Sequence, residues 1–241
     1  MDELWVDTPY AEEISNHVEK WLGPVEYVLH EIISDVVHID ILVVKPGASR
    51  PCYTLVTSGM SAKRMTVPEG REDWALAELI ITLPASNAYL ASEERQSETD
   101  IGMDEKLDFE ASEPPGYYPV RQLKQFARYP HLADSWIGPG HTLVTADPPE
   151  PLGEDTKMTG YLVELPYAIK SSVGFYLQTK EEVRVNFLQM YAIHTDELEF
   201  KLKYGADALM KKLIDDDSPA TLAWYDPVRP SVLRKKFFGL F

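Results

Sequence analysis

Near the start of the chain stands HEIISDVVHIDILVV (residues 30–44), followed closely by YTLVTSGMS (residues 53–61). Both runs are rich in the β-branched and aliphatic residues of a buried strand, and turn residues such as Pro46-Gly47 lie between them. They therefore predict neighbouring strands. The first run also carries polar side chains that an ordinary core strand does not need: His30, Glu31, Asp35, His38 and Asp40.

The same pattern of short apolar runs bounded by turn residues continues along the chain and predicts further strands. Because consecutive strands usually pair with one another, we expect one antiparallel or mixed sheet. The predicted strands are Tyr27–Ile33, Val36–Val44, Tyr53–Thr57, Ala77–Leu83, Thr142–Thr145, Gly160–Leu165 and Val183–Ile193.

Apolar residues at helical spacing predict helices that cover this sheet. One helix is expected over residues 9–22, and a second from Pro119 to just before Pro130. Two more follow the last strand, one with Asp196 in its first turn and one beginning near Ala206. Strands followed by segregated helices indicate an α+β fold, and we expect a single domain over residues 1–241.

The charge of the chain limits its possible partners. The formal net charge is −16, with 39 acidic and 23 basic residues in 241, so the protein would repel the phosphates of nucleic acid. The same charge favours basic proteins or basic peptides, although it could also serve only solubility. With one cysteine, Cys52, no terminal signal sequence and no run that could span a bilayer, we expect a cytoplasmic protein that is not membrane-bound.

Two segments differ in composition from the rest of the chain. Residues 86–116 contain nine acidic and two basic residues, which predicts an acidic insertion on the surface. The C-terminal residues 233–241 combine Arg234-Lys-Lys236 with three phenylalanines. This basic-aromatic tail could bind a partner or an acidic membrane surface, but docking on its own domain is the favoured interpretation.

The polar residues of the first two runs could hold a metal ion or carry acid–base chemistry, but their spacing fits no known zinc or catalytic motif. We expect a buried network in which the Asp40 carboxylate orients His38 through a hydrogen bond, with His30 nearby. Thr57 and Ser58 contribute hydroxyl groups to it, and Gly59 supplies a backbone conformation that other residues resist.

No complete catalytic or cofactor motif is present in the sequence. The segment around Ser58 and Ser61 lacks the Gly-x-Ser-x-Gly pattern of a nucleophile elbow, and no phosphate-binding glycine loop is found. We therefore expect no catalytic residues, no metal and no cofactor.

The loop around Trp136 is the best candidate for a binding surface. His131 and His141 flank it, and these histidines could join the His38–Asp40 pair in one cleft. In the favoured interpretation, His131 instead caps a helix end, where a cationic group is stabilised, and His141 anchors the next strand. Trp136 would then be the aromatic anchor for a protein partner.

Taken in order, these segments resemble the suppressor of fused family, in particular its bacterial stand-alone members. The resemblance spans about residues 10–232 and rests on the succession of motifs, because no single one would suffice. In addition to the two opening runs, the matching segments are Leu79–Pro84, Leu123–His131, Gly138–Thr142, Asn186–Gln189, Thr195–Leu198 and Asp226–Pro230.

The resemblance implies a protein-binding domain with no enzymatic activity. Animal relatives restrain a Hedgehog-pathway transcription factor by clasping a short extended segment of it, with the help of a further C-terminal domain that a chain of this length is not expected to contain. Bacterial members are thought to act as immunity proteins that neutralise toxins, and an acidic protein suits a basic toxin. The alternatives are a regulatory peptide-binding adaptor and a hydrolase that uses the His/Asp cluster.

Overall fold

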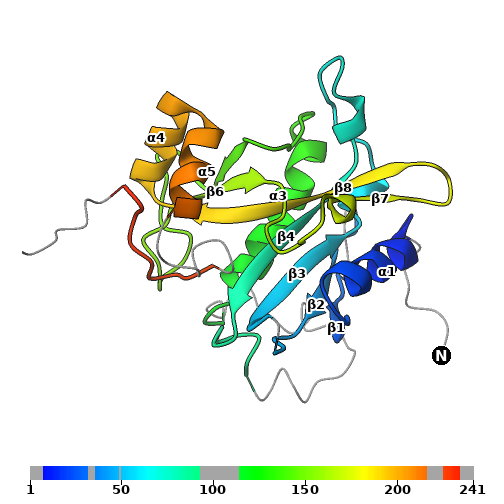
Figure 1. The fold of residues 1–241 in the computed structure, drawn as a ribbon, viewed down its shortest axis with the longest axis horizontal. Coiled ribbons are helices and arrows are strands. Elements are labelled where there is room, and N and C mark those ends of the chain that lie inside the picture. The colour runs from blue at the N-terminus through cyan, green and yellow to red at the C-terminus, as the bar shows by residue number, and fades with distance from the viewer. Residues whose placement is uncertain (1–7, 32–35, 49, 93–113, 216–224, 234–241) are drawn as a thin grey trace, which may run out of the picture.

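The computed structural model describes residues 8–31, 36–48, 50–92, 114–215 and 225–233. Within them, eight strands form one sheet in the order β1-β2-β3-β4-β8-β6-β5, with β7 also paired to β8 (Figure 1). The pairs are antiparallel except β4 and β8, which run parallel. The predicted single α+β domain with a mixed sheet is confirmed.

The strands follow the apolar runs closely, with small shifts at their ends. The second strand begins only at Asp40, because residues 36–39 are irregular. Ile32 and Ile33, which we expected in the first strand, lie outside the described residues, and the three-residue strand β7 was not predicted. The strands are β1 Tyr27–Leu29, β2 Asp40–Val44, β3 Cys52–Ser58, β4 Ala77–Pro84, β5 Thr142–Val144, β6 Gly160–Glu164, β7 Tyr176–Gln178 and β8 Arg184–Ile193.

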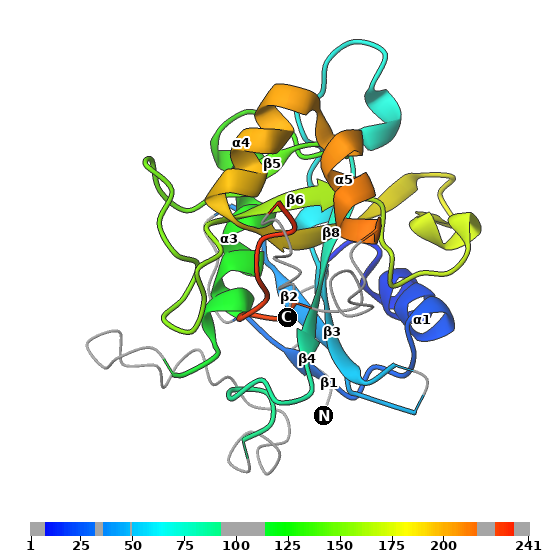
Figure 2. The ribbon, with the colours of Figure 1, turned by 60° about the vertical axis from the view of Figure 1, so that its left-hand side comes forward.

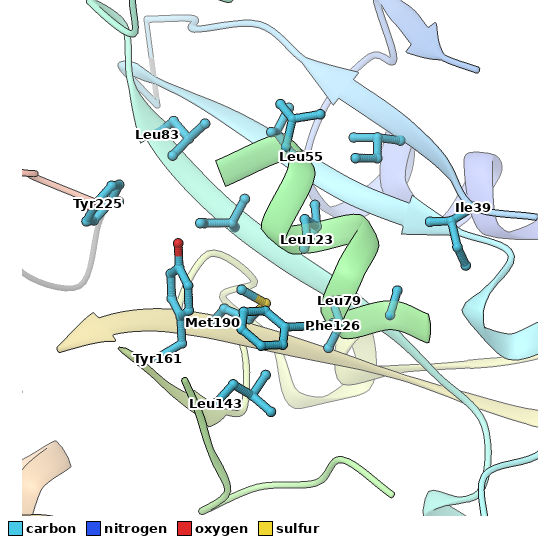
Figure 3. Packing of buried hydrophobic residues seen from close by; sticks show 14 of the residues in the cluster. Ile39, Leu55, Leu79, Leu83, Leu123, Phe126, Leu143, Tyr161, Met190 and Tyr225 are labelled. Atoms are coloured by element: carbon cyan, nitrogen blue, oxygen red, sulfur yellow. The ribbon is translucent and has the colours of Figure 1, made fainter. Parts of the chain in front are cut away.

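Helix α3 (Tyr118–Leu132) covers one face of the sheet. Its residues Leu123 and Phe126 pack among side chains of the central strands, including Leu55 and Leu79, to form the main core (Figure 3). The prediction that this helix ends before Pro130 is wrong. Pro130 lies in the last turn, where its missing N–H removes a single helical hydrogen bond, and the helix continues to Leu132.

The opposite face of the sheet is covered by α1 (Ala11–Trp21) and by the pair α4 (Thr195–Tyr204) and α5 (Ala206–Asp215). Ile14 and Val18 of α1 pack on Val56 and Phe187, while Leu209 of α5 packs in a separate cluster with residues of β6 and β8. Figure 2 shows α5 beside β6 and β8, apart from α1. Both faces of the central strands are therefore buried, which explains why these strands read as continuous apolar runs.

The C-terminal residues 225–233 cross the domain and attach to it through buried polar groups. The Tyr225 amide donates to the Thr82 carbonyl at 2.7 Å. The Arg229 guanidinium forms a two-pronged ion pair with Glu197, with both N–O distances at 2.7 Å. A buried ion pair of this kind is tolerated because each charged group also makes further hydrogen bonds. The basic-aromatic tail beyond Leu233 lies outside the described residues.

The acidic insertion begins later than we predicted. Tyr89 and Leu90 are buried in the main core, and the Tyr53 hydroxyl donates to the Leu90 carbonyl. The Asn87 side chain donates to the carbonyl of Gly116 at 3.0 Å, so the two ends of the segment are held together. The boundary at Ser86 is therefore wrong, and residues 93–113, which hold all of the segment's charged side chains, lie outside the described residues.

Candidate functional site

Asp40, the first residue of β2, is the centre of a compact polar cluster. Its carboxylate accepts hydrogen bonds from the ring nitrogens of His38 at 2.9 Å and His30 at 3.2 Å, and from the backbone amide of Glu31 at 3.0 Å. The Asp40 carboxylate and the His38 ring are largely buried, whereas the His30 side chain is 30% exposed. This arrangement fixes the ring orientation of each histidine.

Glu31 extends the cluster to helix α3. Its carboxylate accepts from the Ile39 amide at 2.9 Å and forms an ion pair with Arg128. Burial lowers the pKa of Arg128, and the carboxylate partner compensates for the lost hydration. These contacts hold the irregular segment before β2 against α3. The cluster therefore has a structural role that requires no ligand.

The sequence suggested that the hydroxyl groups of Thr57 and Ser58 belong to the same network as the histidines, but they do not. Thr57 donates to Glu78 at 2.6 Å, and the Glu78 carboxylate also accepts from the amides of Gly59 and Ser61 and from the Ser61 hydroxyl. Glu78 has no exposed surface, and burial raises its pKa. Sequence reasoning missed Glu78, although an acidic residue inside the apolar run 77–83 was a visible signal.

Gly59 joins the two clusters by close backbone approach. Its φ is +127°, as expected for a conformation that other residues resist, and a Cβ atom there would lie 1.9 Å from the His38 carbonyl oxygen. Ser61 donates to the fully buried Glu78 and is itself buried, so it is not presented to a substrate. Among the residues that the structure describes, no three His, Cys, Asp or Glu side chains are grouped to hold a metal ion.

His131 does not act as the cationic helix cap that we predicted. Its Nε2 lies 3.0 Å from the Met60 carbonyl oxygen, so the ring bonds to another segment. Burial lowers its pKa and thus disfavours the cationic form, and its Nδ1 finds no partner within the described part of the chain. His131 therefore tethers the end of α3 to the turn after β3.

The loop from Trp136 to His141 is firmly built. The Trp136 and His141 rings meet edge to face with centroids 4.4 Å apart, and a Cβ atom on Gly138 would lie 2.3 Å from the Trp136 ring. The His141 carbonyl accepts from the Val163 amide, so His141 leads into β5 as expected. Trp136 is half-buried against the main core, and burial lowers the pKa of His141.

The surroundings of this loop are open and apolar. Tyr129 and Leu132, at the end of α3, are 45% and 67% exposed. Strand β5 is the last in the sheet order, and no strand pairs with its outer edge in the described ranges. Free strand edges and exposed aromatic residues are typical of surfaces that bind an extended peptide. The loop thus connects two features that can contact a partner.

Comparisons with known proteins support the fold and identify its relatives. The family described as suppressor of fused protein (SUFU) matches residues 35–223, whereas no curated protein sequence matches.

No described helix is long and apolar enough to cross a membrane.

Among solved structures, a chain of the Sufu–Fu complex is similar, with a TM-score of 0.63 and 16% identity over 93% of each chain. A suppressor of fused homologue from Neisseria gonorrhoeae has a TM-score of 0.61 and 15% identity over 94% of this chain and 98% of its own. Drosophila Suppressor of Fused has a TM-score of 0.60 and 17% identity, covering 93% of this chain and 52% of the fly chain.

Proposed function

The chain belongs to the suppressor of fused family, and we propose that it is a non-enzymatic protein-binding domain that holds a basic segment of a partner protein. The binding face in this proposal consists of strand β5 and the loop Trp136–His141. The partner is a basic toxin, which the protein neutralises in the cytoplasm as an immunity-type protein. One solved relative was crystallised as a Sufu–Fu complex, which supports protein binding as the type of activity.

One observation carries the proposal: a rigid loop joins an unpaired strand edge to exposed apolar side chains. An extended segment could add to the edge of β5 through backbone hydrogen bonds. Its side chains could then contact Leu132, Tyr129 and Trp136. Because the loop is already held by Gly138 and His141, little conformational entropy would be lost on binding.

Charge supports a basic partner. The net charge is −16, and the exposed carboxylates Asp134, Asp147 and Glu150 lie close in sequence to the loop and to β5. Such a surface attracts a basic protein at long range and speeds association at low salt.

Affinity capture from the native host tests this proposal. The immobilised wild-type protein should retain a basic protein, and both Trp136→Ala and Leu132→Ser should lose it. Leu132 is mostly exposed, so its substitution separates binding from folding. Val173→Ser is the matched control, because Val173 is 63% exposed and lies in another segment, Ser172–Phe175.

Co-expression then distinguishes neutralisation from mere binding. The captured protein should inhibit growth when expressed alone and should be harmless beside the wild-type chain. If Leu132→Ser and Trp136→Ala both retain the partner as well as the wild-type protein does, the proposed binding face is wrong. If the captured protein is not toxic, a regulatory adaptor is favoured instead.

A further inference from the structure

Helix α1 leaves part of the sheet uncovered. Ile14 and Val18 pack onto the strands, and a neighbouring stripe of the helix lines a cavity. The space between this stripe and the sheet is a cavity of about 330 Å³, which is within the range of small-molecule sites. We call it the α1 pocket, and it is lined by Ala11, Glu12, Ser15, Asn16, Glu19, Val28, Asp40, Leu42 and Ser58.

The sheet side of the α1 pocket combines apolar and polar groups. Val28 and Leu42 supply aliphatic surface from β1 and β2. Ser58, at the end of β3, is only 3% exposed and lines the pocket. Its hydroxyl can donate or accept a hydrogen bond, so it offers a polar contact to a ligand in the cavity.

The charges of the pocket are all of one sign. Glu12 and Glu19 lie two helical turns apart on the exposed side of α1, about 10 Å along the helix axis. Asp40 adds a third carboxylate, and its position is fixed by His30 and His38. No lysine or arginine lines the pocket, so its carboxylates can pair with a ligand that brings positive charge.

We propose that the α1 pocket binds a linear aliphatic diamine or polyamine. The methylene chain lies on Val28 and Leu42, one ammonium group reaches Asp40 and the Ser58 hydroxyl, and the other pairs with the carboxylate of Glu12 or of Glu19. This site lies on the face of the sheet opposite α3, so it is independent of the proposed protein-binding face. A lysine side chain shares part of this chemistry but has a single ammonium group.

Calorimetric titration with hexamethylenediamine tests the proposal. The wild-type protein should bind one equivalent, and the double variant Glu12→Gln/Glu19→Gln should bind about tenfold more weakly. Ser58→Ala should also weaken binding. Ser15→Phe should abolish it, because Ser15 is a half-buried helix residue that lines the pocket and a large ring would fill the space.

The matched control is Glu69→Gln/Glu150→Gln, which removes the same charge from exposed positions outside the pocket. This control should leave the affinity for the diamine unchanged. If both double variants weaken binding equally, the effect comes from the net charge of the protein and not from the pocket, and the proposal is overturned. Absence of binding by the wild-type protein would overturn it as well. Hexylamine and N-acetyl-lysine methylamide should bind more weakly than the diamine; equal affinity would instead assign the pocket to a single lysine side chain.

Discussion

Replacing Arg229 with methionine should lower the free energy of unfolding by about 3–5 kcal/mol. The Glu197 carboxylate is completely buried and accepts four hydrogen bonds, two from Arg229 and one each from the amides of His194 and Val232. The substitution removes the two charge-assisted bonds, each worth about 1.5–3 kcal/mol, and leaves an unpaired buried carboxylate.

A double variant separates the cost of an unpaired buried charge from the net contribution of the ion pair to stability. The double variant Arg229→Met/Glu197→Leu removes both charges, so it should be more stable than Arg229→Met alone. The control is the exposed pair Lys45–Glu26, with a distance of 3.0 Å, where Lys45→Met should cost about 0–1 kcal/mol. Urea unfolding followed by circular dichroism measures all four proteins, and an Arg229→Met variant no less stable than Lys45→Met would refute the reasoning.

Three further predictions concern other parts of the chain. Asp40→Ala should lower stability by about 1–3 kcal/mol in urea unfolding, because it leaves buried donors unsatisfied; an unchanged midpoint would contradict the role of Asp40. Replacing residues 93–113 with a short Gly/Ser linker should change the free energy of unfolding by less than about 1 kcal/mol, because closure entropy depends weakly on length and Asn87 already binds Gly116; loss of folding would reveal an essential element. Burial lowers the pKa of His17 below 6.5, so its contribution to stability is complete above pH 6.5 and declines at lower pH. His17→Gln should therefore flatten the stability profile between pH 7 and 5, and an unchanged slope would exclude this residue as a cause.

The sequence was sufficient for most of the sheet because its central strands are continuous apolar runs that are buried on both faces. The runs at 40–44, 77–84 and 184–193 are continuous and bounded by turn residues. Strand β7 was missed because it has only three residues, none of them fully buried. Pro130 was assigned as a helix end because local sequence does not show that the packed helix can accommodate it in its last turn.

The polar interactions were predictable only where the partners are close in sequence. The contact between His38 and Asp40 spans two residues, and the sequence indicated it. Glu78 binds groups 17–21 residues away, and Arg229 binds Glu197 across 32 residues. Such pairs are created by the tertiary fold. The α1 pocket escaped prediction for the same reason, because the helical pattern does not reveal how far α1 sits from the sheet.

The affinity of the partner for Trp136→Ala tests the central claim most directly. Truncating an aromatic anchor typically costs about 2 kcal/mol or more, so the dissociation constant should rise about 30-fold. Trp74→Ala is the control, because Trp74 is also partly buried against the main core but lies outside the proposed face. The account predicts a large loss for Trp136→Ala and unchanged binding for Trp74→Ala; a folded Trp136→Ala variant that binds the partner as tightly as the wild-type protein would contradict it.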